Sequence, residues 1–315
     1  MNDLRIIFMG TPDFAVGVLK NLVDKGKNIV GVITSPDKPA GRGRKLRQSA
    51  VKQYALDQGL YVLQPKNLKS DEFLKELKDL DANLHIVVAF RMLPEVVWNM
   101  PKFGTFNLHA SLLPQYRGAA PINWVIMNGE TNTGVTTFYI DEKIDTGAII
   151  LKKELKIEDD ETAGSLHDKL MELGSDLVLE TVSLIENNKA FPIEQDQNEE
   201  LKNAPKLHSE NTKINWHHSV EEIDQLVRGL YPYPIAWSTL NNGDQRIKVK
   251  IFKCEPINEE HTHKPGSIYS TTKELRVAAM NGYIKINEIQ LPGKRKMDIR
   301  SLLNGYKFIK NSIMM

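Results

Sequence analysis

Cysteine is nearly absent from this 315-residue sequence, which holds only Cys254 and therefore no internal disulfide. No apolar run approaches the roughly 18 residues that are needed to span a bilayer. The N-terminus has an apolar stretch of about five residues and no cleavage-site pattern, so it does not resemble a signal peptide. Together these absences predict a protein of the reducing cytoplasm that does not enter a membrane.

The glycine pattern of a dinucleotide-binding turn is also lacking. Gly10-Thr11-Pro12 lies between a strand-like and a helix-like segment, but the second and third glycines of G-x-G-x-x-G are missing. Pro12 also removes a backbone donor. This argues against NAD binding, although a helix N-terminus at this place can still line a substrate pocket.

Familiar nucleophile and zinc patterns are missing as well. Ser111 does not lie in a G-x-S-x-G elbow, and the histidine pairs at 217–218 and 261–263 have no cysteine partners. We therefore expect neither a serine nucleophile nor a bound metal.

The formal net charge of +1 hides an asymmetry along the chain. From Glu210 to the C-terminus, 16 Lys and Arg stand against 11 Asp and Glu, a net of +5 that leaves −4 for the first 209 residues. The sharpest basic cluster is Lys294-Arg295-Lys296. Such a basic third suggests a polyanionic partner, although ordinary surface solubility would explain the same count.

Apolar strands alternate with amphipathic helices in the first part of the chain. Thr11 is expected as the N-cap of the first helix and Pro12 as its first residue. Such alternation predicts an α/β fold with a Rossmann-like, doubly wound, mostly parallel sheet. The expected strands cover residues 5–10, 27–34, 84–90 and 105–109, and further helices cover 50–58 and 69–80.

A different pattern follows. Residues 134–141 and 147–155 read as paired strands, and residues 162–187 as one long helix. After a polar stretch, a short helix over 220–229 precedes short β-like runs broken by Asn-Gly and Pro-Gly turns, which predict a smaller, OB-like β-barrel. We therefore expect a catalytic domain over residues 1–187, a linker over 188–209 and a barrel domain over 210–315.

The densest chemistry lies at the end of the expected fourth strand. Alternate side chains of a strand share one face, so Asn107 and His109 should point the same way. The Asn amide can donate to a carbonyl oxygen that becomes an oxyanion, and the imidazole can take a proton from an attacking amine. The pair thus suits acyl transfer, but a polar strand end that caps a loop would look the same.

A carboxylate could complete the pair. Asp145 lies in the turn Ile144-Asp145-Thr146-Gly147, four residues after Asp141. A buried Asp beside His109 would hold the imidazole and stabilise its charged form. Asp-Thr-Gly is equally a common turn, and the spacing alone does not bring Asp145 to His109.

Longer motifs around these residues resemble the formyltetrahydrofolate-dependent formyltransferases, and within them the tRNA-acting branch. The resemblance covers essentially the whole chain. It is carried by the residues Asn107–Pro114, Tyr116–Ile122 and Ile144–Gly147, by Ile6–Phe14 and Ser35–Leu46, and by Ile214–Trp216 and Tyr231–Trp237. One departure is that Phe90-Arg91-Met92-Leu93-Pro94 is one residue shorter than the usual aromatic-Gly motif and lacks its Gly, which puts the shape of the pterin pocket in doubt.

The resemblance implies a cytoplasmic, metal-free and monomeric enzyme. It would transfer a formyl group from 10-formyltetrahydrofolate to the free α-amine of methionyl initiator tRNA, supporting translation initiation. The implied catalytic residues are Asn107, His109 and Asp145. The implied folate-binding residues are Ser111, Leu112, Leu113 and Pro114, and the implied tRNA contacts are Phe14, Arg42, Arg44 and Lys45, together with the barrel.

Three other functions remain open at this point. A folate formyltransferase that acts on a glycinamide ribonucleotide or an amino sugar nucleotide would use the same three residues. It would not explain the loop Thr34–Ser49, which carries five Lys and Arg against one Asp. That loop could order on RNA phosphates, or it could simply be solvated. A hydrolase that releases formate would replace the amine by water, whereas a non-enzymatic RNA-binding protein would leave the three residues idle.

Overall fold

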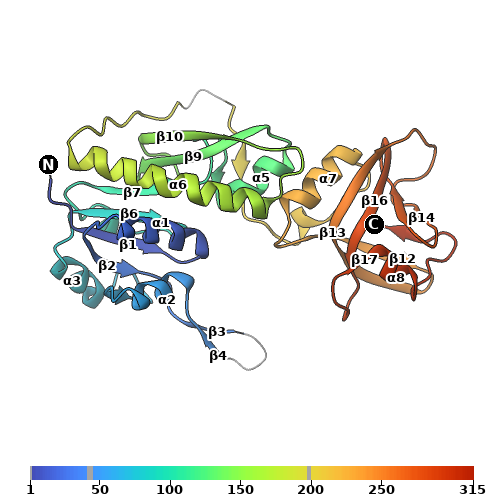
Figure 1. Cartoon of the computed structure of the whole chain (residues 1–315), viewed down its shortest axis with the longest axis horizontal. Coiled ribbons are helices and arrows are strands. Elements are labelled where there is room, and N and C mark those ends of the chain that lie inside the picture. The colour runs from blue at the N-terminus through green and yellow to red at the C-terminus, as the bar shows by residue number, and fades with distance from the viewer. Residues whose placement is uncertain (1, 41–44, 197–199) are drawn as a thin grey trace. The chain divides into compact units, whose positions relative to one another are not determined.

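The computed structural model describes residues 2–40, 45–196 and 200–315 (Figure 1). The chain forms two compact units, neither of which is continuous in sequence. The first unit comprises residues 1–118, 132–156 and 167–203, and the second comprises residues 119–131, 157–166 and 204–315.

The first unit is built on a seven-stranded sheet with the order β10-β9-β7-β6-β1-β2-β5. Strands β7, β6, β1, β2 and β5 are parallel, whereas β9 and β10 are antiparallel. The predicted doubly wound, mostly parallel sheet is therefore confirmed. The strands are β1 (Ile6–Gly10), β2 (Ile29–Ile33), β5 (Val62–Leu63), β6 (Leu84–Val88), β7 (Thr105–His109), β9 (Asn132–Tyr139) and β10 (Ile149–Lys156).

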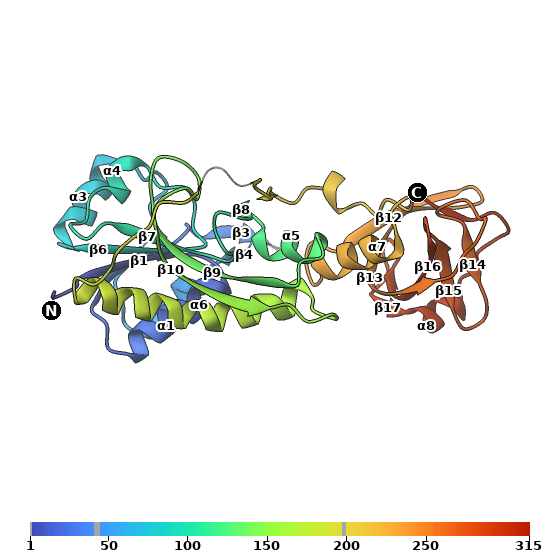
Figure 2. The same ribbon diagram turned by 90° about the horizontal axis from the view of Figure 1, so that it is seen from above.

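Helices cover both faces of this sheet. Figure 2 shows α1 and α6 on one face and α3 and α4 on the other. The α3/α4 face packs on a core that includes Ile7, Phe73, Leu77, Val87 and Val97. The helices of this unit are α1 (Asp13–Asp24), α2 (Ala50–Asp57), α3 (Asp71–Asp79), α4 (Glu95–Trp98) and α6 (Ala163–Glu186), whose first turn belongs to the second unit.

Two local predictions need correction. Helix α1 begins at Asp13, and its N-cap position is Pro12 in extended conformation with no side-chain cap, so Thr11 is not the N-cap. The fixed φ of Pro12 suits the residue before the helix as well as its first residue. The basic loop also contains a two-stranded ribbon of β3 (Lys38–Ala40) and β4 (Lys45–Arg47).

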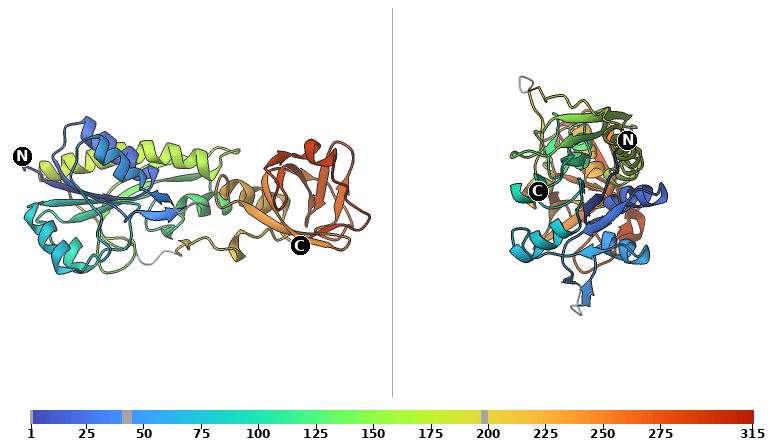
Figure 3. Two further views of the ribbon diagram at one scale, coloured as in Figure 1. Left: turned by 90° about the horizontal axis from the view of Figure 1, so that it is seen from below. Right: turned by 90° about the vertical axis from the view of Figure 1, so that its left-hand side faces the viewer.

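The second unit contains an antiparallel sheet with the order β14-β15-β16-β13-β12-β18, to which β17 adds beside β16. An isolated bridge between Ser267 and Ile313 joins its two ends, so the sheet is a nearly closed barrel, as predicted (Figure 3, left). The strands are β12 (Ala236–Asn242), β13 (Gln245–Asn258), β14 (Ile268–Ser270), β15 (Leu275–Ala278), β16 (Gly282–Gln290), β17 (Met297–Asp298) and β18 (Ile313–Met314).

Helix α7 (Val220–Gly229) packs its buried Val220, Ile223 and Val227 on the barrel core. A capping box at Ser219 and Glu222 fixes where this helix begins. The remaining elements are β8 (Arg117–Gly118), α5 (Pro121–Met127), β11 (Asn203–Ala204), the 3-10 helix η1 (Glu210–Thr212) and α8 (Ile299–Leu303).

His85 in β6 is a buried titratable group away from the motifs of the sequence. Burial lowers the pKa of His85 from 6.5 to about 4, and its Nδ1 has no hydrogen-bond partner among the residues that the structure describes. The unfolded chain therefore binds this proton at a higher pH than the folded protein. We expect about 3 kcal/mol of stability, fully present above pH 6.5, to be lost as the pH falls toward 4.

Urea unfolding measured at several pH values checks this expectation. The His85→Leu variant lacks the titrating ring, so its free energy of unfolding should fall less between pH 6.5 and 4 than that of the wild type. Equal slopes for the two proteins would show that other groups dominate acid unfolding.

Candidate active site

Asn107 and His109 lie near the C-terminal end of β7 and point to one face of the sheet, as strand alternation predicts. In the register, Asn107 pairs with Val87, which faces the α3/α4 core. Leu108 points to the other face and packs against Gly174 of α6, where an added Cβ would meet it at 2.8 Å. Open α/β sheets place their sites at this carboxyl edge, beside the point where the strand order reverses between β1 and β6.

The Asn107 amide is half-buried, and within the described part of the chain it makes no hydrogen bond. Such an amide is therefore available to a ligand that arrives at the strand end.

His109 is 6% exposed, and its Nε2 lies 2.9 Å from the carbonyl oxygen of Tyr116. A carbonyl oxygen can only accept, so Nε2 must carry the proton that it donates. In the neutral ring Nδ1 then holds the free lone pair. Nδ1 lies 3.8 Å from Oδ2 of Asp145, which is too long for a hydrogen bond but close enough for a charge on the ring to interact with the carboxylate.

Asp145 reaches His109 by a path that the sequence spacing does not reveal. Strand β9 runs antiparallel to β7 and ends with Tyr139 opposite Phe106, at the beginning of β7. The segment that follows must therefore return about 10 Å along the sheet, three residues at the rise of a strand, to bring Asp145 beside His109.

The returning turn is tightly shaped. Asp145 has a φ of +56°, a left-handed conformation that costs a non-glycine residue about 1 kcal/mol or more. A Cβ at Gly147 would lie 1.7 Å from the carbonyl oxygen of Tyr139, so only glycine fits there. Asp141 accepts hydrogen bonds from Thr146 Oγ1 and from the Lys143 amide, so its carboxylate shapes the turn.

Two further residues hold this turn. Gly118 lies within the Tyr116–Ile122 motif but was given no role there, and the sequence did not single out Gln195. Gly118 donates its backbone N–H to Asp145 Oδ2 at 3.0 Å. Gln195 is only 7% exposed and donates to the carbonyl oxygens of Asp145 and Gly147. Gln195 belongs to residues 188–209, which were expected to form a linker, and it lies beside the candidate site. The signal that could have located it is weak, since a Gln in a polar stretch looks like any exposed Gln.

The segment Ser111–Pro114 lies directly after β7. Ser111 and Leu113 have no exposed surface, and Ser111 Oγ donates to the Gln115 carbonyl oxygen. Thr136 Oγ1 in turn donates to the Ser111 carbonyl oxygen and accepts from the Leu113 amide. The Ser111 and Leu113 side chains are therefore buried within the protein, whereas the Leu112 and Pro114 side chains are partly exposed.

The structure describes the side chain of only one of the four residues of the first unit that were expected to contact tRNA. Phe14 is 6% exposed, and its ring meets the His167 ring edge-on at 5.3 Å, so most of its surface is covered by the protein itself. Arg42 and Arg44 lie outside the described residues. Lys45 begins β4, and only its backbone is described.

Arg91, which marks the departure from the family motif, connects two loops at the carboxyl edge of the sheet. Its guanidinium donates to the carbonyl oxygens of Pro65 and Lys66 and lies 5.7 Å from the centre of the Phe90 ring. Ala89 before it has a φ of +47°. The shortened segment is thus anchored to the loop that follows β5.

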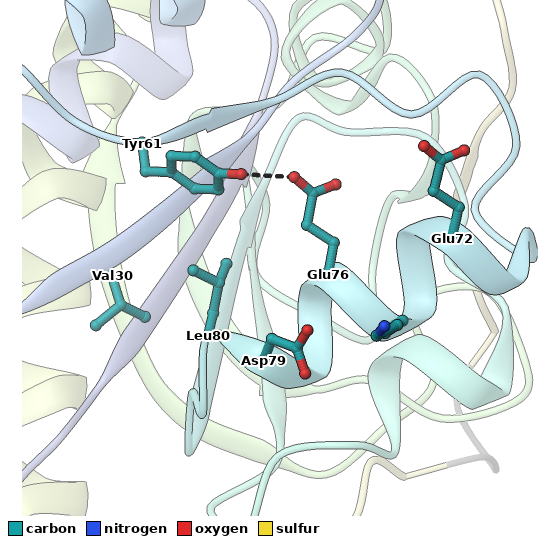
Figure 4. A pocket seen from close by; sticks show the side chains of 7 residues that line it. Val30, Tyr61, Glu72, Glu76, Asp79 and Leu80 are labelled. Carbon is teal, nitrogen blue, oxygen red and sulfur yellow. Dashed lines mark hydrogen bonds between the residues drawn. The ribbon is translucent and has the colours of Figure 1, made fainter.

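A pocket of about 420 Å³ lies along α3, apart from the residues above (Figure 4). Val30 and Leu80 give it apolar surface, and the Tyr61 hydroxyl donates to Glu76 at 2.6 Å. Val30 stands near the amino end of β2, whereas Asn107 and His109 stand near the carboxyl end of β7. Among the described residues, no three His, Cys, Asp or Glu side chains gather into a metal-binding group, and no helix is long and apolar enough to cross a membrane.

The second unit carries a basic stripe on the outer side of β13, which we define as Arg246, Lys248 and Lys250. All three are exposed, and none pairs with a described carboxylate. Lys248 Nζ lies 3.7 Å from the centre of the Trp237 ring of β12. By contrast, Lys296, which belongs to the basic cluster Lys294-Arg295-Lys296, pairs with Glu288 at 2.7 Å. This ion pair raises the pKa of Lys296 and offsets its charge.

Comparison with known proteins places the chain in a family. The model for the formyl transferase family matches residues 4–182, and the model for the formyl transferase C-terminal domain matches residues 206–307. A methionyl-tRNA formyltransferase of Flavobacterium johnsoniae is 56% identical, over 98% of this chain and 98% of its own. That of Bacteroides fragilis is 53% identical, over 96% of this chain and 95% of its own.

Solved structures share the fold at lower identity. A sugar 3N-formyl transferase, solved with dTDP and 5-N-formyl-THF, has a TM-score of 0.63 at 23% identity and covers 94% of this chain and 100% of its own. HypX from Aquifex aeolicus, in complex with tetrahydrofolic acid, has a TM-score of 0.65 at 20% identity and covers 96% of this chain and 47% of its own. On the family models and the high identity to its curated relatives, the chain belongs to the formyl transferase family.

Proposed function

We propose that the protein transfers the formyl group of 10-formyltetrahydrofolate to the free α-amine of methionyl initiator tRNA and so supports translation initiation. The observation that carries this proposal is the cluster of Asn107, His109 and Asp145 at the carboxyl edge of the sheet. In this proposal the catalytic domain spans residues 1–187, residues 188–209 link it to the barrel of residues 210–315, and the protein acts as a cytoplasmic monomer without a metal.

Asn107 stabilises the charge that develops on the formyl oxygen. The methionyl amine attacks the formyl carbon, and the carbonyl oxygen becomes an oxyanion as the tetrahedral intermediate forms. The unpaired Asn107 amide can donate to that oxygen without first breaking a hydrogen bond of its own. A preorganised donor of this kind stabilises the transition state more than the substrate.

His109 and Asp145 manage the proton. With Nε2 committed to the Tyr116 carbonyl oxygen, Nδ1 takes the proton from the attacking amine. The imidazolium that results is stabilised by the negative charge of Asp145, 3.8 Å away. The bond between the formyl carbon and N10 of the folate then breaks, and the proton passes to N10, which leaves tetrahydrofolate and formyl-methionyl-tRNA.

The folate donor would lie against the segment Ser111–Pro114, through its backbone and the Leu112 and Pro114 side chains. The tRNA acceptor is supported by the names of the curated relatives and by the unpaired basic stripe Arg246, Lys248 and Lys250. Lysine and arginine side chains without carboxylate partners can neutralise phosphates and release counterions. In this proposal Phe14, Arg42, Arg44 and Lys45 contact the acceptor end of the tRNA.

The double variant Arg246→Ala/Lys250→Ala should weaken tRNA binding without affecting the folate. We expect KM for methionyl-tRNA to rise roughly tenfold and the slope of log K against log salt to fall by about two, one for each phosphate that is no longer neutralised. Lys248 is left in place so that its contact with Trp237 is preserved. Steady-state formylation at several salt concentrations measures both quantities.

Lys273→Ala is the matched control, since Lys273 is exposed in the turn between β14 and β15, away from the stripe. An unchanged salt slope in the double variant would remove the stripe from the tRNA contact surface.

One assay separates the proposed reaction from its rivals. The protein is given formyl-labelled 10-formyltetrahydrofolate with methionyl initiator tRNA, an amino sugar nucleotide, a glycinamide ribonucleotide or water alone. Label on the tRNA supports the proposal. Label on a small amine favours another formyltransferase, free formate favours a hydrolase, and unreacted donor with bound tRNA favours a binding protein.

A further inference from the structure

We infer that Gln195 is a positioning residue that sets the geometry between Asp145 and His109. It lies outside the family motifs that point to the reacting centre, in the stretch after α6. The inference rests on the proposed function, because it assigns Gln195 to the same reaction.

The Gln195 amide is fully used in hydrogen bonds. Its Nε2 donates to the carbonyl oxygens of Asp145 at 3.0 Å and Gly147 at 2.8 Å. Its Oε1 accepts from Arg117, from Nη2 at 2.6 Å and from Nε at 3.2 Å. The orientation of the amide is fixed by chemistry, because carbonyl oxygens only accept and a guanidinium only donates.

These contacts join the two backbone segments that hold the candidate pair. Arg117 stands between Tyr116, whose carbonyl oxygen accepts from His109, and Gly118, whose N–H donates to Asp145. The other end of the Gln195 amide binds the turn that carries Asp145 itself. A single side chain thus ties the segment that orients the imidazole to the turn that carries the carboxylate.

The turn that carries Asp145 needs hydrogen bonds of this kind to keep its conformation. It folds back along the sheet from the end of β9, and Asp145 adopts a left-handed φ of +56°. A non-glycine residue keeps that conformation only when its surroundings impose it. The carbonyl groups on both sides of Thr146 are the ones that Gln195 binds, so the amide imposes the path of the backbone at this point.

The chain delivers Gln195 to this place by a short pairing. Ile193 and Ile149, the first residue of β10, exchange two backbone hydrogen bonds, of 2.8 and 2.9 Å. The side chain two residues beyond then enters the protein, where it is 7% exposed, while Glu194 and Asp196 on either side are exposed. Gln195 is therefore buried in specific hydrogen bonds, whereas its two neighbours in the sequence are exposed to solvent.

Gln195→Met keeps the length and removes all four hydrogen bonds. We expect kcat for formylation to fall about tenfold, with KM for both substrates within twofold of wild type, because the reacting geometry changes and the binding surfaces do not. With Asp145 less well placed, the imidazolium that forms during the reaction loses stabilisation, so the loss should appear in kcat and not in either KM.

Coupling to Asp145 provides the decisive measurement. In an Asp145→Asn background, Gln195→Met should lower kcat by less than twofold, since the carboxylate that Gln195 positions is already gone. A full tenfold loss in both backgrounds would overturn the inference. Glu194→Met, in the exposed neighbouring position, is the matched control and should keep wild-type kcat and pH profile.

If the Gln195→Met variant does not fold, Gln195→Glu provides a second test of the inference. It keeps the contact with Arg117 but cannot donate to the two carbonyl oxygens, so kcat should again fall while both KM values stay nearly unchanged. Wild-type behaviour of this variant would overturn the inference. If the wild-type protein itself did not formylate methionyl-tRNA, the proposed function would fail instead, so the two failures are distinguishable.

Discussion

Replacing Asn107 by alanine is expected to lower kcat by about 10²–10³, with KM for folate and for tRNA within about threefold of wild type. This is the loss that removal of one preorganised oxyanion donor produces. The amide has no hydrogen bond within the described part of the chain, so truncating it breaks no internal hydrogen bond. We therefore expect the melting temperature to stay within about 2 °C, and circular dichroism checks this beside the kinetics.

Asn107→Asp sharpens the test. It has nearly the same shape but presents acceptors in place of the amide donor, so it should lose at least as much activity as the alanine variant. Asn99→Ala, at an exposed position after α4, is the control and should behave as wild type. A kcat within threefold of wild type for Asn107→Ala would remove the amide from the chemistry.

Local sequence patterns predicted most of the sheet and the pair on β7, although the short edge strand β5 was not among the expected strands. Strand alternation alone places Asn107 and His109 on one face, and the register against β6 bears this out. The alternation of apolar runs with amphipathic helices predicted parallel strands, and β1 and β6 are buried along their whole length, as the central strands of such a sheet should be.

The approach of Asp145 to His109 could not be predicted in the same way. It depends on a segment that folds back from the end of β9, and nothing in its own residues encodes where it ends. The contacts that fix it come from Gly118 and Gln195, the latter 50 residues further along the chain. The residues of a turn indicate that the chain reverses direction there, but they do not indicate which distant side chain will stabilise the turn.

The polar stretch after α6 makes a contact that its composition does not reveal. Composition predicted a linker, and most of its residues are exposed, but the buried amide of Gln195 binds the turn that carries Asp145. The charge count was also too coarse, because it gave Lys294-Arg295-Lys296 the greatest weight although Lys296 pairs with Glu288. Among the described residues, Arg246, Lys248 and Lys250 of β13 also have no carboxylate partner, and because strand alternation separates them in the sequence, the charge count did not single them out.

Replacing His109 by glutamine is expected to lower kcat by about 10³, within the range that loss of a general base produces. Glutamine can still donate to the Tyr116 carbonyl oxygen as Nε2 does, so the strand end should keep its shape. What is lost is the basic Nδ1 that faces Asp145. The kinetics should therefore change through kcat, with both KM values nearly unchanged.

The pH profile identifies the base more directly than the size of the loss. In the wild type, kcat should fall at acidic pH as Nδ1 becomes protonated and can no longer accept from the amine. The residual activity of His109→Gln should lack that limb. His217→Gln, which changes an exposed histidine of the second unit, should retain both the rate and the limb. An acid limb that persists in His109→Gln would assign the base to another group and leave His109 with a structural role only.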